Sequence, residues 1–182
     1  LRQDPDIIMV GEIRDLETAQ IAVRAANTGH LLLSTLHTND ASSALTRLVD
    51  MGIEPYLVAS SVSGILSQRL VRKICRQCIQ EVQIPPYAPQ RRLLKIDDTE
   101  EFTAFAGTGC KACGYTGYYG RVAIGEVLFL TVSVRRMLLN KESASGMLNH
   151  LIEKEGFITL RENGVEKVKE GITTISEIER CL

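Results

Sequence analysis

The chain has 182 residues, of which 45% are hydrophobic, and its 21 basic and 22 acidic residues give a formal net charge of −1 at pH 7. A chain of this length can bury about 70% of its unfolded surface, which is enough for one large or two small domains. The balanced charge argues against nucleic acid or an anionic membrane surface as a partner, and no apolar run approaches the roughly 20 residues that cross a bilayer.

The chain begins without Met and without a signal peptide, and it runs directly into a strand pattern. We therefore expect a piece of a longer protein located in the cytosol.

Residues 1–72 alternate between strand and helix patterns. The β-branched run Ile7–Val10 is typical of a fully buried parallel strand, so this region predicts an α/β fold with a parallel sheet. The elements expected after it are a helix from Asp15 to Asn27, a strand over 31–33, a helix that Asp40 begins and Gly52 ends, a helix from Pro55 to Leu66, and a short strand over 69–72.

The composition changes after residue 72. The next stretch contains four cysteines and many prolines and glycines with little helical periodicity, which is typical of a small core held by a metal. A strand pattern follows over 122–129, and the remainder predicts helices, with Thr159 and Thr174 each three residues before a Glu, as in a capping box. The predicted divisions are residues 1–72, 73–120 and 121–182.

A carboxylate follows the first predicted strand, because Gly11 and Glu12 come directly after Val10. A buried parallel strand delivers its next side chain to the carboxyl edge of the sheet, where ligands bind in open α/β folds. Glu12 there could orient an attacking water or lie near Mg²⁺. A solvated acid that begins a loop is the alternative for this residue.

Polar side chains also follow the second predicted strand. His37, Thr38 and Asn39 lie at its carboxyl end, beside Glu12 if the two strands are neighbours. Imidazole and hydroxyl donors at that edge can stabilise the charge of a phosphoryl group in transfer. A structural role for the histidine is the alternative. The expectation on which the functional interpretation depends is that Glu12 and His37 emerge side by side from adjacent parallel strands.

These segments resemble a known family of motor proteins. The segment Leu1–Asp15, LRQDPDIIMVGEIRD, is similar to the Walker B segment of the type II secretion and type IV pilus assembly ATPases. The stretch from Thr28 to Asn39 resembles the histidine box of that family, and QRLVR at 68–72 also matches. The resemblance covers nearly the whole chain in the same order.

The resemblance implies a truncated RecA-like (P-loop NTPase) core and a homo-hexamer that hydrolyses ATP with Mg²⁺. Glu12 would be the Walker B glutamate that positions or activates water, Arg14 would brace the nucleotide pocket, and His30 and His37 would be the histidine-box residues near the γ-phosphate. The parent would be cytoplasmic and peripheral at the inner membrane, held there by an inner-membrane platform and by cytoplasmic adaptor proteins.

The chain lacks one motif of that family. No G-x-x-x-x-G-K-[ST] sequence occurs in the 182 residues, so the phosphate-binding loop, its lysine and its Mg²⁺-binding hydroxyl are absent. We therefore expect this polypeptide, as a C-terminal portion, not to hydrolyse ATP alone.

The four clustered cysteines form two CxxC pairs, Cys75 with Cys78 and Cys110 with Cys113. Four thiolates suffice for a closed tetrahedral Zn²⁺ site, which is structural because no position remains open for water. Disulfides and free thiols are the alternatives, and the absence of a secretion signal favours zinc. This tetracysteine insert resembles that of the assembly and secretion branch of the family, whereas the pilus-retraction branch typically lacks it.

Two other function classes remain open from the sequence. One is a zinc-stabilised protein interaction module with no role in nucleotide binding. The other is a zinc-ribbon nucleic-acid binder, against which the balanced charge argues, because such domains usually carry a basic stripe.

Overall fold

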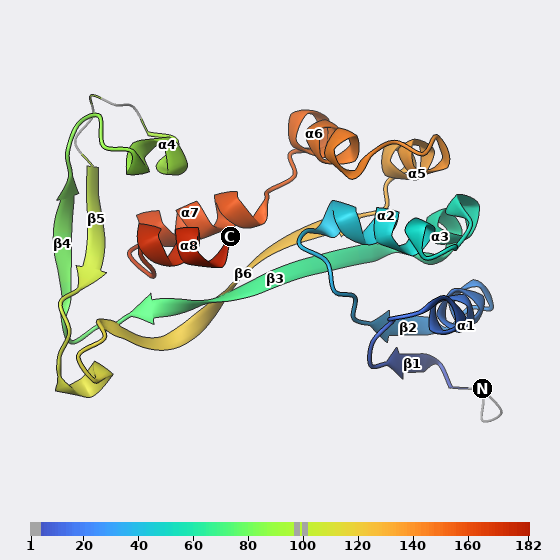
Figure 1. Cartoon of the computed structure of the whole chain (residues 1–182), viewed down its shortest axis with the longest axis horizontal. Coiled ribbons are helices and arrows are strands. Elements are labelled where there is room, and N and C mark those ends of the chain that lie inside the picture. Colours follow the sequence, from blue (N-terminus) through green and yellow to red (C-terminus); the bar gives the residue numbers. More distant parts are fainter. Residues whose placement is uncertain (1–4, 97–98, 100–101) are drawn as a thin grey trace. The chain divides into compact units, whose positions relative to one another are not determined.

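The computed structural model describes residues 5–96, 99 and 102–182 (Figure 1). The chain divides into two compact units. Unit 1 comprises Leu1–Ser67 and Val127–Phe157, and unit 2 comprises Gln68–Glu126 and Ile158–Leu182. Leu1–Asp4 of the segment that resembles Walker B lie outside the described residues. The predicted divisions after residues 72 and 120 do not coincide with these units, and the assignment of functions to those three stretches stays a prediction.

Unit 1 begins with a parallel β-α-β arrangement (Figure 1, blue). Strand β1, Ile7–Val10, pairs in parallel with β2, Leu31–Ser34, and helix α1, Leu16–Asn27, connects them. Asp15 caps the helix by accepting a hydrogen bond of 2.8 Å from the Thr18 N–H, which satisfies a donor that a helix start leaves free. The two strands and the helix expected here are confirmed.

The two faces of the β1–β2 pair differ in burial. Val10 and Leu32 pack against the hydrophobic core of unit 1. The opposite face carries apolar side chains that are 52–80% exposed, namely Ile7, Met9, Leu31 and Leu33. Buried parallel strands are apolar on both faces, so this sequence is suited to a sheet that is covered on both sides.

Four further helices complete unit 1 and enclose its core. Leu45, Val58, Val134 and Met147 are fully buried there, because each lies on the apolar face of a different helix. The helices are α2 (Ala41–Asp50), α3 (Pro55–Ser61), α5 (Val132–Leu139) and α6 (Ala144–Glu155).

The third helix is shorter than the sequence predicts. It ends at Ser61 rather than at Leu66, because the backbone is already extended at Val62. Strand β3 begins at Gly64 and runs to Ile74, so it includes the short strand expected over 69–72. It pairs with β6, Tyr118–Phe129, a partner about 55 residues further along the chain that local periodicity does not reveal.

Unit 2 contains a hairpin that the sequence reasoning did not anticipate. Strand β4, Ile79–Ile84, pairs antiparallel with β5, Phe102–Gly107, so that Ile79 lies opposite Gly107. The short helix α4, Gln90–Leu94, lies in the segment that joins the two strands.

Helices α7, Leu160–Lys169, and α8, Ile175–Cys181, complete unit 2. The capping box predicted at Thr159 is confirmed, since Thr159 and Glu162 exchange both hydrogen bonds. At Thr174 only half of the box forms. The hydroxyl of Thr174 accepts from the Glu177 N–H, but the carboxylate of Glu177 is engaged elsewhere.

The Glu177 carboxylate is fully buried between two arginines. It accepts hydrogen bonds of 2.9 and 2.7 Å from the Nε and Nη2 of Arg72 on β3, and bonds of the same two lengths from Arg180 on α8. The backbone N–H of Arg72 donates a further bond of 2.9 Å. These donors, first Arg180 and then Arg72, hold the pKa of Glu177 well below its usual range. This ion-pair network therefore links α8 to β3.

Glu177→Gln is expected to lower the free energy of unfolding by about 2–4 kcal/mol at pH 7. Removing one partner of a buried ion pair costs about 3–5 kcal/mol, and the loss is smaller here because Arg72 and Arg180 reach solvent, with 43% and 57% of their side chains exposed. Folding lowers the pKa of Glu177, so the difference from wild type should be complete above about pH 4.3 and should shrink at lower pH.

Urea unfolding followed by circular dichroism measures this difference. Glu179→Gln, an exposed glutamate on the same helix, is the matched control and should change the free energy of unfolding by less than about 0.5 kcal/mol. Equal effects of the two substitutions would show that the buried network contributes nothing specific.

Candidate functional sites

Glu12 lies just beyond the carboxyl end of β1. The loop that contains it is hydrogen-bonded to the segment that follows β2. The hydroxyl of Thr35 donates a hydrogen bond of 2.7 Å to the carbonyl of Gly11, and the Ile13 N–H donates one of 3.0 Å to the carbonyl of Thr35. The Glu12 side chain is only 18% exposed. Sequence reasoning did not single out Thr35, because its role depends on the pairing of two segments 24 residues apart.

Arg14 and His37 converge on the Glu12 carboxylate. Arg14 Nε donates a hydrogen bond of 2.6 Å to Oε2 of Glu12, and His37 Nε2 lies 2.8 Å from Oε1. Both partners reach solvent, with side chains that are 76% and 89% exposed. The expectation that Glu12 and His37 emerge side by side from adjacent parallel strands is therefore confirmed.

The electrostatics keep Glu12 ionised. The hydrogen bond from Arg14, together with the charges of Arg14 and His37, lowers the pKa of this carboxyl. Oε1 is shielded from solvent and, within the described part of the chain, accepts no hydrogen bond, although His37 Nε2 lies 2.8 Å from it. A carboxylate whose pKa is lowered is a weaker base, and its oxygens remain hydrogen-bond acceptors.

His30 lies at the other end of the strand pair. It immediately precedes β2, and its Nδ1 is 3.0 Å from the carbonyl of Ala25 and 3.0 Å from the hydroxyl of Thr28. The structure therefore brings Arg14 and His37 to Glu12, but it does not bring His30 there.

The four predicted zinc ligands form one cluster in unit 2. The Sγ atoms of Cys75, Cys78, Cys110 and Cys113 all lie within 4.8 Å of one another. Three of the separations are 3.8–3.9 Å, namely Cys75 to Cys110, Cys78 to Cys113, and Cys110 to Cys113. A tetrahedral Zn²⁺ with Zn–S bonds of about 2.3 Å places its sulfurs about 3.8 Å apart, so the donor set fits this ion.

Backbone N–H groups of the second knuckle point at two of the sulfurs. The Gly109 N–H lies 3.3 Å from Sγ of Cys78, and the Cys110 N–H lies 3.2 Å from Sγ of Cys113. The contact from Cys110 lowers the pKa of Cys113 to about 6, whereas burial raises the pKa of Cys78 to about 11. Such N–H donors stabilise thiolates, the form in which cysteine binds a metal.

The glycine at position 109 is required by this geometry. Its φ is +90°, and a Cβ there would lie 2.7 Å from the carbonyl oxygen of Tyr115. Cys181 lies apart from the cluster, on α8, with its Sγ 3.1 Å from Arg180 Nη2.

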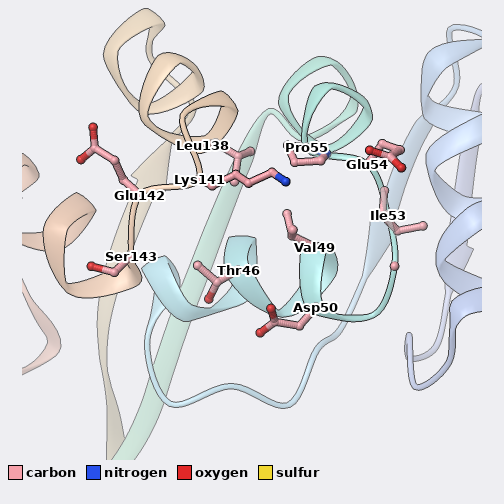
Figure 2. A pocket seen from close by; sticks show the side chains of 11 residues that line it. Thr46, Val49, Asp50, Ile53, Glu54, Pro55, Leu138, Lys141, Glu142 and Ser143 are labelled. Atoms are coloured by element: carbon pink, nitrogen blue, oxygen red, sulfur yellow. The ribbon is translucent and has the colours of Figure 1, made fainter.

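Unit 1 also contains a cavity of about 460 Å³ that none of the predicted site residues lines. It is formed by the end of α2, the turn before α3 and the turn between α5 and α6. Figure 2 shows the carboxylates of Asp50, Glu54 and Glu142 pointing apart around it, so they do not form a ligand cluster. Among the described helices, none combines the length and apolar character needed to cross a membrane.

Comparison with known proteins relates these features to one family. The profile of the family described as "Type II/IV secretion system protein" matches residues 1–180. The chain is 48% identical over 178 residues to the type IV pilus assembly ATPase PilB of Thermus thermophilus, covering 98% of this chain and 20% of that protein. It is 45% identical over 180 residues to the type II secretion system ATPase E of Vibrio cholerae, covering 99% of this chain and 35% of that protein.

A solved structure, that of the pilus retraction motor PilT with bound ADP, resembles the chain with a TM-score of 0.65 and 26% identity. The match covers 99% of this chain and 40% of PilT. The chain thus spans about a fifth to a third of the length of the two curated relatives. Because the family profile matches nearly the whole chain, the chain belongs to the Type II/IV secretion system protein family.

Proposed function

We propose that this chain is the C-terminal part of an ATPase that powers type II secretion or type IV pilus assembly. The observation that carries the proposal is the cluster of Glu12, Arg14 and His37 beyond the carboxyl ends of two parallel strands. The names of the two curated relatives support it, because both are named as ATPases.

In this proposal, Glu12 positions the attacking water. Its lowered pKa supports hydrogen bonding to water more than proton abstraction. Arg14 holds the carboxylate in place and braces the nucleotide pocket. His37 lies on the other oxygen, where an imidazole can stabilise the charge of the γ-phosphate. For His30 we propose no contact with the γ-phosphate beyond its predicted membership of the histidine box, because it lies at the end of β2 far from Glu12.

The nucleotide and Mg²⁺ would bind in the longer protein, where the metal neutralises charge on the phosphates. The exposed apolar face of β1 and β2 supports a RecA-like core in which further strands or helices cover this face. The proposal extends to a homo-hexamer that is cytoplasmic and peripheral at the inner membrane, bound there by a membrane platform and by adaptor proteins.

Zn²⁺ is proposed as a structural ion of unit 2. Four sulfurs would complete the tetrahedral shell of this ion, so no position would remain for a substrate or water. The ion would fix the first knuckle, which follows β3, relative to the second knuckle, which lies between β5 and β6.

The purified chain alone is expected not to hydrolyse ATP. It has no phosphate-binding loop, so nothing in the sequence supplies the lysine and hydroxyl that hold the β- and γ-phosphates and Mg²⁺. Release of inorganic phosphate from MgATP should equal the buffer background. Turnover that disappears in Glu12→Gln would contradict this expectation, because it would show a complete site in these residues.

A chimera tests the proposed activity itself. The matching segment of the Vibrio cholerae type II secretion ATPase E is replaced by this chain, and ATP hydrolysis is measured. We expect hydrolysis at a rate comparable to that of the parent enzyme. A chimera that folds, binds zinc and assembles as the parent does, but lacks hydrolysis, would contradict the proposal.

A further inference from the structure

A small pocket lies beside the first cysteine knuckle of unit 2. Its volume is about 280 Å³. The residues that line it are Lys73, Ile74, Cys75, Arg76, Gln77, Ala112 and Tyr119.

The pocket lies on the face of β3 and β6 opposite to the Glu177 network. Successive side chains of a strand point to opposite faces, so a cation–tyrosine pair on the inner face is followed by a second such pair on the outer face. Arg72 and Tyr118 form the inner pair, in which the guanidinium lies 4.1 Å from the ring centroid and binds the buried Glu177. Lys73 and Tyr119 are the next residues, and both line the pocket.

Arg72 of the inner pair has an anionic partner, which neither cation of the pocket has among the described residues. Lys73 and Arg76 form no ion pair within the described part of the chain, whereas Arg72 binds a carboxylate through both its backbone and its guanidinium. No acidic side chain lines the pocket. Tyr119, which lines the pocket with these cations, is 69% exposed. The lining residues of the pocket therefore carry two positive charges and no carboxylate.

The backbone around the pocket is held in place. The Ile74 N–H donates to the carbonyl of Ile172, and the Cys75 N–H donates to the carbonyl of Gly117, each at 2.9 Å. Cys75 also belongs to the four-cysteine cluster, so a Zn²⁺ bound there would hold this wall of the pocket through the Cys75 side chain. A preformed site loses little conformational entropy when a ligand binds.

We propose that this pocket binds an acidic side chain, Asp or Glu, from a segment of a partner protein, with Lys73 and Arg76 contacting the carboxylate and Tyr119 packing against its neighbouring residue. The volume is slightly below the 300–1,000 Å³ typical of small-molecule sites, so it suits one or two side chains. Two lining cations are fewer than the 4–8 that typically mark binding to anionic lipid. The proposal does not depend on the ATPase function, since all these residues lie in unit 2.

The test is a titration of the ¹⁵N-labelled, zinc-loaded chain with a synthetic peptide of repeating Glu-Asp-Leu, observed by NMR. We expect saturable shifts at the amides of residues 73–77, 112 and 119. A peptide with Gln and Asn in place of the acids is the ligand control and should cause no saturable shift. Vesicles that contain phosphatidylglycerol form a separate arm.

The double variant Lys73→Glu with Arg76→Glu is expected to weaken peptide binding at least tenfold. Arg161→Glu is the matched control, because Arg161 is exposed in the same unit, outside the pocket, and should leave binding unchanged. Zinc content and far-ultraviolet circular dichroism report whether each variant folds. If the double variant loses its fold, Lys73→Gln with Arg76→Gln replaces it, and a threefold or greater loss is expected.

Three results would overturn the proposal. The first is the absence of saturable shifts at these amides. The second is an equal loss of binding in Arg161→Glu, which would indicate general charge attraction. The third is a response of the same amides to the vesicles but not to the acidic peptide, which would assign the pocket to lipid.

Discussion

Cys75→Ser is expected to reduce bound zinc from about one ion per chain to well below one and to destabilise unit 2 by several kcal/mol. Structural Zn²⁺ contributes on the order of 10 kcal/mol or more in zinc-finger peptides, and a serine hydroxyl is a poor replacement for one of four thiolates. Cys75 is only 3% exposed, so water cannot easily take the vacant position.

The measurement combines elemental analysis for zinc with thermal unfolding of freshly purified, reduced protein. Cys181→Ser is the matched control, because Cys181 is outside the cluster and should keep both zinc content and stability. A chelator should reproduce the effect of Cys75→Ser in the wild-type chain. Wild-type protein that unfolds identically with and without a chelator would rule out a structural ion.

The local signals in the sequence predicted unit 1 well up to the third helix. A β-branched run, an Asp cap and a Gly stop each act within a few residues, and each appears at the expected place around β1, α1, β2 and α2. The position of Glu12 followed from the same local information. Its side chain had to leave the carboxyl end of β1, and the only further assumption was that β2 is the neighbouring strand.

Pairing between distant segments could not be predicted in the same way. The end of α3 and the start of β3 are decided by β6, which follows about 55 residues later, so helical periodicity extended too far. The β4–β5 hairpin could not be predicted from the sequence for a similar reason. Its strands are separated by 17 residues, and β4 carries apolar residues only at Ile79, Val82 and Ile84.

The sequence also did not predict that the chain goes back to unit 1 after β6 and then enters unit 2 again. Residues 127–157 pack with the N-terminal segment, and residues 158–182 pack with the zinc-binding segment. Both stretches are helical with similar amphipathic patterns, so nothing local distinguishes their destinations. At Glu177, the capping-box pattern correctly predicted the helix start, but the buried arginine network uses the carboxylate instead.

Glu12→Gln in the chimera is expected to lower the rate of ATP hydrolysis by about 10²–10⁴-fold, the range typical of losing a group that acts on the attacking nucleophile. Glutamine keeps the size of the side chain but lacks the negative charge that Arg14 and His37 contact. Its amide can still accept one hydrogen bond, so the loop should keep its conformation. Glu17→Gln, on the exposed first turn of α1, is the matched control and should leave the rate unchanged.

The most direct test of the function proposed here is therefore the hydrolysis rate of the Glu12→Gln chimera beside the unsubstituted one, with zinc content measured in both. We predict equal zinc and a loss of at least a hundredfold in rate. Equal rates in two folded, zinc-loaded chimeras would show that the carboxylate beyond β1 does not act on ATP, and would leave unit 2 as a zinc-stabilised module for protein interaction.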